Sequence, residues 1–208
     1  MVVKNLFNGH SNKRSSIGRL KMNNKTHTVA FLGVMGALTF VVLFLETYVF
    51  TILIPLAPPC FLSISLAITL SIFSDWKKMF VGGTLLGVCS LIIAFIIGNV
   101  VFMKPWISVL PRIFVGAVAF GVSKLTLFIV KNSSNKFLTK YLPYSLGAIF
   151  GVITNTVLVL FLMFFGSYIG IEEIIGTFMA INFPIEVVAS ALIVPVLVNA
   201  VKRFNKGA

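Results

Sequence analysis

The chain has 208 residues, of which 58% are hydrophobic and only 11% are charged, whereas a soluble domain carries about 25% charged residues. It contains 21 Phe and five acidic residues, and its net charge is +12. This composition excludes an ordinary soluble domain and predicts a membrane protein. Long apolar runs also exclude a membrane barrel, whose strands would alternate between polar and apolar residues.

Six apolar segments approach the roughly 20 residues that a helix needs to cross about 30 Å of hydrocarbon. In chain order they cover about 28–50, 59–74, 79–102, 107–130, 142–168 and 184–201. The fold class predicted from them is all-α, a polytopic bundle of six transmembrane helices. The bundle comprises residues 28–203, with a basic tail at 1–27 and a short tail at 204–208.

The positions of the cations predict the orientation of the bundle. Fifteen of the 17 Lys and Arg residues fall in the N-terminal tail, at 77–78, within 124–140 and at the C-terminus. Six spans place these four segments on one side, and the other side has only Lys104 and Arg112 as cations. Because cytoplasmic loops carry the excess of Lys and Arg, both termini are predicted to be cytoplasmic. The basic surface then faces anionic lipid headgroups and not nucleic acid.

Sequence motifs for catalysis and energy conversion are missing. No GxxxxGK[ST] string occurs, so we expect no nucleotide phosphate to bind in that way. His10 lies in the tail and His27 at the border of the first span, which leaves no histidine at depth for an intramembrane protease. Cys60 and Cys89 lack a CxxC spacing and are predicted to be plain core residues. We therefore predict no enzyme activity, no cofactor, no metal site and no disulfide.

Five of the spans carry a polar or charged residue in the half that the topology places outside. These residues are Glu46, Asn99, Arg112, Asn155 and Glu186. A charge at the bilayer centre costs about 2.5–3.5 kcal/mol on insertion scales, so an intramembrane charge indicates a functional site. Apolar walls with a few convergent polar groups are typical of a ligand pocket. The five residues predict such a pocket, open to the outside.

The same residues also have structural interpretations. Arg112 and Glu186 are either pocket residues or helix-end residues whose charges reach the membrane interface. Glu46 either forms an ion pair with Arg112 or contacts a ligand. Asn155 either contacts a ligand or joins two helices by a hydrogen bond.

Small residues recur at helical spacing in two spans. Gly33-x3-Ala37 lies in the first span and Gly147-x3-Gly151 in the fifth, and this spacing lets helix backbones approach closely. At 100° per residue, Ala37 and Glu46 lie roughly 180° apart on the first helix. We therefore expect this helix to line the pocket with one face and to dock a partner with the other.

Four strings carry a family resemblance: THTVAFLGVMGALTFVVLFLE, SVLPRIFVGAVAFGV, GVITNTVLVL and INFPIEVVASALIVPVLVNAV. In this order and spacing, over residues 26–203, the chain resembles the substrate-binding membrane subunits (S components) of energy-coupling factor vitamin transporters. Within them it is similar to the group of pantothenate and hydroxymethylpyrimidine carriers. The resemblance implies six helices, capture of a vitamin from outside, and a lid at residues 50–59.

The same resemblance implies partners and a mechanism. The first helix of the family bears a stripe of small residues that docks on a transmembrane coupling subunit, and this chain keeps Gly33 and Ala37 of it. Two cytosolic ATPases supply the energy, and the loaded subunit topples in the membrane to release its substrate inward.

The sequence leaves the substrate and two other functions open. Arg112 suits a carboxylate because it forms bidentate contacts, which makes pantothenate the first choice, whereas Glu46 and Glu186 suit the amino and hydroxyl groups of hydroxymethylpyrimidine or pyridoxine. The chain is alternatively a stand-alone secondary transporter, although no internal repeat relates 28–102 to 107–201. The third possibility is a membrane scaffold protein whose polar residues are structural.

Overall fold

The computed structural model describes residues 24–53, 60–73, 79–131, 135–166 and 183–207. The chain forms two units, Met1–Gly33 and Val34–Ala208. The fold and the site below belong to the larger unit. Most of the predicted tail at 1–27 and most of the predicted lid at 50–59 lie outside the described residues.

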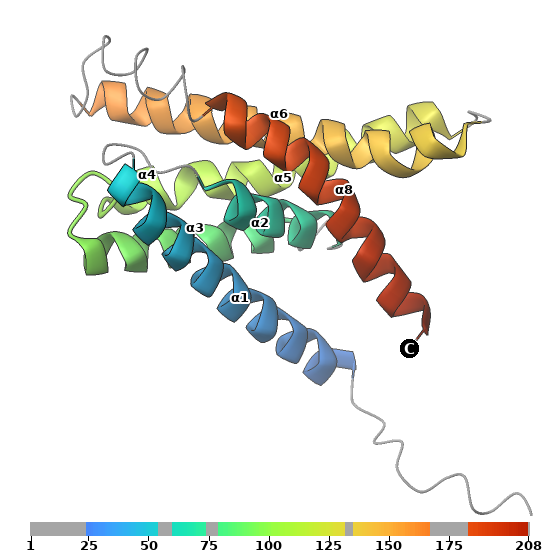
Figure 1. Ribbon diagram of the computed structural model, residues 1–208, viewed down its shortest axis with the longest axis horizontal. Coiled ribbons are helices and arrows are strands. Elements are labelled where there is room, and N and C mark those ends of the chain that lie inside the picture. The colour runs from blue at the N-terminus through green and yellow to red at the C-terminus, as the bar shows by residue number, and fades with distance from the viewer. Residues whose placement is uncertain (1–23, 54–59, 74–78, 132–134, 167–182, 208) are drawn as a thin grey trace, which may run out of the picture. The chain divides into compact units, whose positions relative to one another are not determined.

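Every regular element in the described ranges is a helix (Figure 1). In chain order these are α1 (Asn24–Leu53), α2 (Phe61–Phe73), α3 (Phe80–Ile97), α4 (Pro105–Ser108), α5 (Leu110–Val130), α6 (Lys136–Phe165) and α8 (Phe183–Gly207). The prediction of an all-α fold is confirmed for this part of the chain.

Four described helices are long and apolar enough to cross a membrane, namely Phe80–Ile97, Pro105–Val130, Thr139–Phe165 and Phe183–Arg203. The apolar part of α1, Gly33–Val49, and α2, Phe61–Phe73, are shorter. Large apolar side chains also cover the outside of the bundle, as at Phe128, which is 79% exposed, and Ile129, which is 69% exposed. Such an exterior suits hydrocarbon and not water, so the helices have the character of a membrane protein. The count of six spans and the sides of the termini stay predictions.

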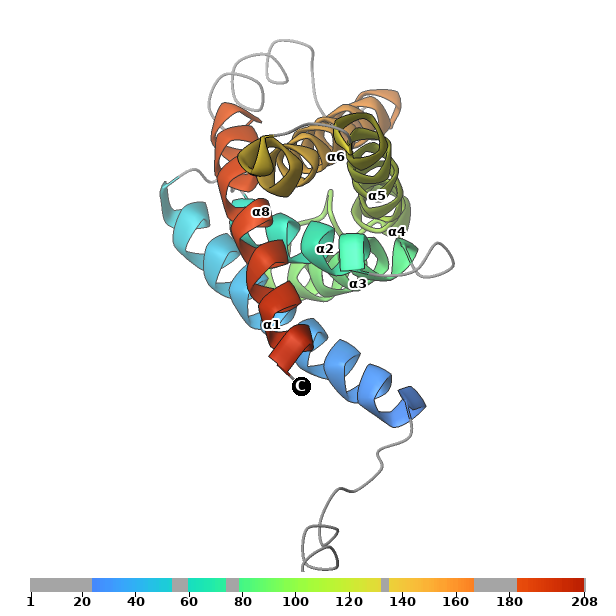
Figure 2. The same ribbon diagram turned by 90° about the vertical axis from the view of Figure 1, so that its right-hand side faces the viewer.

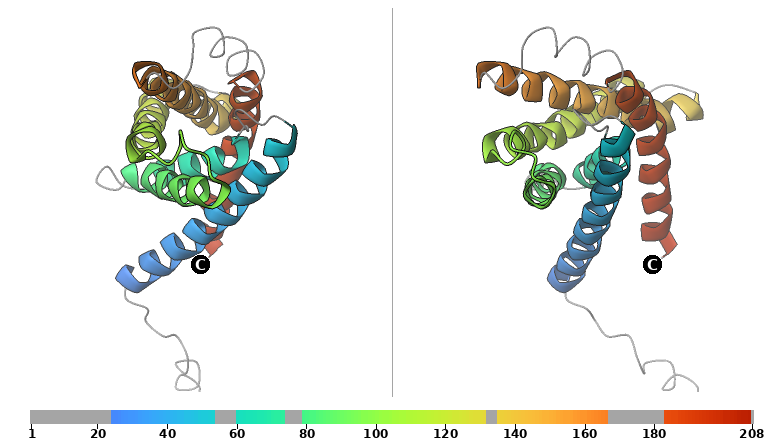
Figure 3. Two further views of the ribbon diagram at one scale, coloured as in Figure 1. Left: turned by 90° about the vertical axis from the view of Figure 1, so that its left-hand side faces the viewer. Right: turned by 60° about the vertical axis from the view of Figure 1, so that its left-hand side comes forward.

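Helix α2 lies at the centre of the packing. It contacts α3, α5, α6 and α8, while α5 packs along α6 and α6 along α8. Figure 2 shows α5 and α6 above α2 and α3, with α8 to one side, and both views in Figure 3 again show α5 beside α6. The buried apolar core includes Ile64 and Ile68 of α2, Val115 of α5, Val152 of α6 and Val194 of α8.

Glycines mark two of the helix contacts. A Cβ on Gly147 would lie 2.8 Å from the Ala119 carbonyl oxygen, and one on Gly151 would lie 3.1 Å from Ile68 Cδ1. The predicted pair Gly147 and Gly151 therefore lies where α6 approaches α5 and α2. Gly33 and Ala37, by contrast, are both exposed.

Several helix ends differ from the predicted bounds for identifiable reasons. Helix α3 ends at Ile97, before the predicted end at 102, because Gly98 adopts a left-handed φ of 80° and its N–H bonds to the Ala94 carbonyl. Such a glycine is a common helix C-terminus. The predicted fourth span is divided at Val109 into α4 and α5, and Pro111 in the first turn of α5 has no N–H to continue the ladder.

Candidate ligand-binding site

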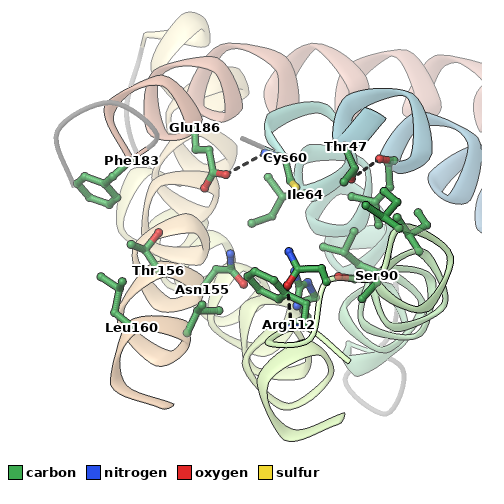
Figure 4. Close-up of a pocket in the computed structure, with 18 of the residues that line it drawn as sticks. Thr47, Cys60, Ile64, Ser90, Arg112, Asn155, Thr156, Leu160, Phe183 and Glu186 are labelled. Carbon is green, nitrogen blue, oxygen red and sulfur yellow. Dashed lines mark hydrogen bonds between the residues drawn. The ribbon is translucent and has the colours of Figure 1, made fainter. Parts of the chain in front are cut away.

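A cavity of about 280 Å³ lies where α3 ends and where α5 and α8 begin. This volume is close to the lower end of the range of about 300–1,000 Å³ that is typical of small-molecule sites. Its walls are mostly apolar, and Figure 4 shows the polar side chains that interrupt them. The apolar lining includes Leu43, Ile64, Leu86, Ile93, Val159 and Leu160.

Four of the five predicted site residues line this cavity. Asn99 follows α3, Arg112 lies in α5, Asn155 in α6 and Glu186 in α8. These residues are far apart in the sequence, and alternating helix directions bring them to one level of the bundle. The structure thus brings them together, while their contact with a ligand stays a prediction.

Glu46 is not among the lining residues. Its side chain is 5% exposed, and its Oε1 accepts a hydrogen bond from the Leu62 N–H at 2.6 Å while its Oε2 accepts one from the Ser63 N–H at 3.0 Å. These amides belong to the first turn of α2, where backbone N–H groups have no acceptor within their own helix. Glu46 therefore caps α2 with both oxygens. Within the described part of the chain it forms no ion pair with Arg112.

The cap is needed because of how α2 begins. Helix α2 has 13 residues and is about 20 Å long, too short for the roughly 30 Å of hydrocarbon. The Cys60 carbonyl accepts the Ile64 N–H at 3.0 Å, so Cys60 occupies the N-cap position, where Ser, Thr, Asp or Asn would normally bond the first amides. Away from water these amides need protein acceptors, and carboxylates from α1 and α8 supply them with the charge that a helix N-terminus favours.

Glu186 is the second of these carboxylates. It lies in the first turn of α8, and its Oε1 accepts a hydrogen bond from the Cys60 N–H at 2.9 Å. Unlike Glu46, it also lines the cavity. In Figure 4 the dashed line between Glu186 and Cys60 marks this bond at the cavity wall.

Arg112 is held at the start of α5 by contacts with its own neighbourhood. It is 7% exposed, its Nη1 donates to the Ser108 carbonyl at 2.5 Å, and its guanidinium carbon lies 5.7 Å from the centre of the Phe102 ring. The Ser108 hydroxyl in turn donates to the Phe102 carbonyl, which fixes the turn before α4. No carboxylate in the described ranges forms an ion pair with Arg112, so its charge remains available for an anion.

The two asparagines of the cavity differ in their bonding. Asn99 Oδ1 accepts the Phe102 N–H at 3.3 Å and closes the turn after α3. Asn155 Oδ1 is buried and has no hydrogen-bond partner among the described residues. The structure therefore gives no support to the interpretation in which this oxygen joins two helices. A buried acceptor without a donor costs about 1–3 kcal/mol, a cost that a bound hydrogen-bond donor would remove.

Sequence reasoning missed the glycines that position Arg112. A Cβ on Gly83 would overlap the Arg112 carbonyl oxygen, and a Cβ on Gly87 would lie 2.9 Å from Val109 Cα. These two α3 glycines therefore let the start of α5 lie directly against α3. The signal was present in the sequence, because Gly83-x3-Gly87 has the spacing that allows close helix approach.

No protein-family model and no curated protein matches the chain. What the site can do must therefore be judged from its chemistry. Its described lining combines the buried guanidinium of Arg112, the carboxylate of Glu186 and the amides of Asn99 and Asn155 with apolar walls. Such a combination can bind and orient a small polar molecule.

Proposed function

We propose that the chain is the substrate-binding membrane subunit of an energy-coupling factor importer and captures a B vitamin or a vitamin precursor in this cavity. The observation that carries the proposal is the convergence of Arg112, Asn99, Asn155 and Glu186 on one cavity in an apolar helical bundle. A charge that forms no ion pair inside such a bundle is costly unless it serves a ligand. The resemblance over residues 26–203 supports this type of importer.

In this proposal the bundle crosses the plasma membrane of a bacterium six times, with both termini in the cytoplasm. The four long apolar helices are four of the spans. The first span is α1, and the second is the predicted segment 59–74, in which α2 covers Phe61–Phe73 and does not by itself reach across the hydrocarbon. The distribution of Lys and Arg supports the orientation. The cavity then opens to the outside, as capture of a scarce nutrient requires.

Pantothenate is the first choice of cargo, with hydroxymethylpyrimidine or pyridoxine next. Two glutamates near Arg112 would disfavour an anion, but both oxygens of Glu46 accept α2 amides and Glu46 does not line the cavity. Among the described residues, Glu186 is then the carboxylate that lines the cavity. The guanidinium of Arg112 suits the carboxylate of pantothenate in bidentate geometry.

Energy would come from partners, because the sequence has no motif for nucleotide phosphates. We propose that a transmembrane coupling subunit binds the α1 face that carries Gly33 and Ala37 and that two cytosolic ATPases drive toppling of the loaded subunit. Exposure of Gly33 and Ala37 supports this assignment. Co-purification with a pair of ATPases would favour the importer, and uptake driven by an ion gradient without them would indicate a secondary transporter.

The decisive experiment measures thermal unfolding of the purified chain in detergent against a panel of B vitamins and their precursors. A ligand at 100 times its dissociation constant stabilises the fold by about 2.7 kcal/mol. We expect a shift with pantothenate that is lost in Arg112→Ala and retained in Arg203→Ala, since Arg203 is an exposed residue away from the cavity.

Other outcomes separate the remaining functions. A shift with a pyrimidine or pyridine alone keeps the importer and changes its cargo. If no vitamin shifts the transition of the folded protein, the proposal is wrong. In that case an Arg112→Ala variant that loses its fold would point to a scaffold.

A further inference from the structure

The two carboxylates at the start of α2 are not equivalent. Glu46 uses both oxygens on the backbone amides of Leu62 and Ser63. Glu186 uses Oε1 on the Cys60 amide, and no donor in the described part of the chain bonds to its Oε2. Since Glu186 also lines the cavity, it can accept a hydrogen bond from a ligand without releasing α2.

Arg112 and Glu186 present opposite charges to the same cavity. Figure 4 shows them on opposite sides, with Asn155 on the side of Arg112. They form no ion pair with each other within the described residues, so neither charge neutralises the other by direct contact. A ligand that reaches from one to the other would meet a cation at one end and a hydrogen-bond acceptor at the other.

We propose that Glu186 determines specificity, selecting a cargo that carries a hydroxyl or ammonium donor at one end and an anionic group, bound by Arg112, at the other. This inference rests on the proposed function and narrows its cargo to one chemical class. A site built to bond a donor rejects the analogue that lacks it, because its own polar group is then left unpaired. An anion without such a donor would leave Glu186 unsatisfied, and a neutral donor would leave Arg112 unsatisfied.

Three ligands with one skeleton test both ends of the cargo on the unmodified protein. Pantothenate has the carboxylate and two hydroxyls, panthenol replaces the carboxylate by a hydroxymethyl group, and N-(3,3-dimethylbutanoyl)-β-alanine keeps the carboxylate but lacks both hydroxyls. Binding is measured by titration calorimetry in detergent. We expect pantothenate to bind at least about tenfold more tightly than either analogue, since a hydrogen bond to a charged group contributes enough for that ratio.

Variants of the two glutamates test which of them accepts the hydrogen bond from the hydroxyl end of the cargo. In Glu186→Gln the amide oxygen can still accept the Cys60 N–H, but its NH2 group cannot accept a bond from the cargo. We expect this variant to bind pantothenate at least about tenfold more weakly and to bind the analogue without hydroxyls as the wild type does. Glu46→Gln is the matched control and should leave the ratio between the two ligands unchanged.

Two results would overturn the inference and keep the proposed function. One is a Glu186→Gln variant that weakens both carboxylate ligands by the same factor or weakens neither. The other is a vitamin without an anionic group that binds when pantothenate does not. Absence of binding by every vitamin, in protein shown to be folded by its unfolding transition, overturns the proposed function and this inference together.

Discussion

The role of a buried carboxylate in an apolar helix bundle depends on which groups its oxygens bond. At Glu46 both oxygens accept backbone amides at 2.6 and 3.0 Å, so the residue completes the hydrogen bonding of a helix start. At Glu186 one oxygen serves the same helix, and the residue also lines a cavity. The first arrangement is structural, whereas the second combines a structural hydrogen bond with a position in the cavity wall.

The structural assignment of Glu46 predicts a loss of stability. Replacing it by Ala leaves the amides of Leu62 and Ser63 without acceptors, and we expect the free energy of unfolding to fall by about 1–3 kcal/mol. Glu46→Gln keeps one acceptor oxygen and should lose less. Thermal and chemical unfolding of both variants in detergent measures the effect. If Glu46→Ala unfolds like the wild type but no longer responds to pantothenate, Glu46 is a ligand contact.

For single residues, the sequence predicted their depth in the membrane but not their hydrogen-bond partners. Hydropathy placed Arg112, Asn155 and Glu186 at one level because each lies in an apolar run of known direction. Hydropathy could not predict the role of Glu46, because its carboxylate accepts amides of α2 and those amides depend on where α2 begins. That start follows a proline-rich stretch and has Cys60 where a local cap would stand, so the partner lies in another helix.

Helices α3 and α5 approach each other so closely that the contact depends on missing side chains. Gly83 lies against the Arg112 carbonyl and Gly87 against Val109. This close contact has two consequences. The two helix backbones pack closely against each other, and the first turn of α5, which carries Arg112, is fixed relative to the cavity.

Gly83→Ala should therefore damage both the fold and the site. The added Cβ meets backbone that cannot rotate away, and overpacking of this kind costs about 1–3 kcal/mol or more. Gly121→Ala is the matched control, since it lies in the same helix as Arg112 and a Cβ there meets no atom within 4 Å. We expect Gly121→Ala to be neutral or to stabilise by up to about 1 kcal/mol. Equal unfolding temperatures for the two variants would contradict the close contact at Gly83.

At the scale of elements, the apolar runs predicted which segments are helical, because each run of that length needs internally bonded backbone. The ends were less predictable. Gly98 ends α3 before the run itself ends, and α6 begins at Lys136 and accommodates Pro143 within the helix. Hydropathy alone cannot locate these ends, because they depend on backbone conformation and on capping.

Four described lysines, within two turns of a helix end or next to one, lie over aromatic rings. Lys124 is 5.4 Å from the Phe120 ring centre and Lys140 is 5.2 Å from that of Tyr141, while Lys202 donates to the Tyr144 hydroxyl. These belong to the end where α5 finishes and α6 starts. Lys104, near the cavity, lies 5.8 Å from the Trp106 ring centre. Amphipathic side chains in such pairs are typical of the boundary between hydrocarbon and headgroups.

This arrangement predicts on which side of the membrane each end lies. Lys104 and Lys131 flank one apolar helical stretch, Pro105–Val130, so a single crossing should separate them. In a background with Cys60 and Cys89 replaced by Ser, a membrane-impermeant maleimide applied to intact cells should label Lys104→Cys.

Lys131→Cys should be labelled only after the membrane is permeabilised, because positive charge gathers on the cytoplasmic side. Labelling of both variants from outside would show that Pro105–Val130 does not cross. Labelling of Lys131→Cys alone from outside would show that the bundle has the opposite orientation and that the cavity opens to the cytoplasm. Capture of a vitamin from outside then fails even if the cavity binds one, because the guanidinium of Arg112 would meet cargo only after it had already entered the cell.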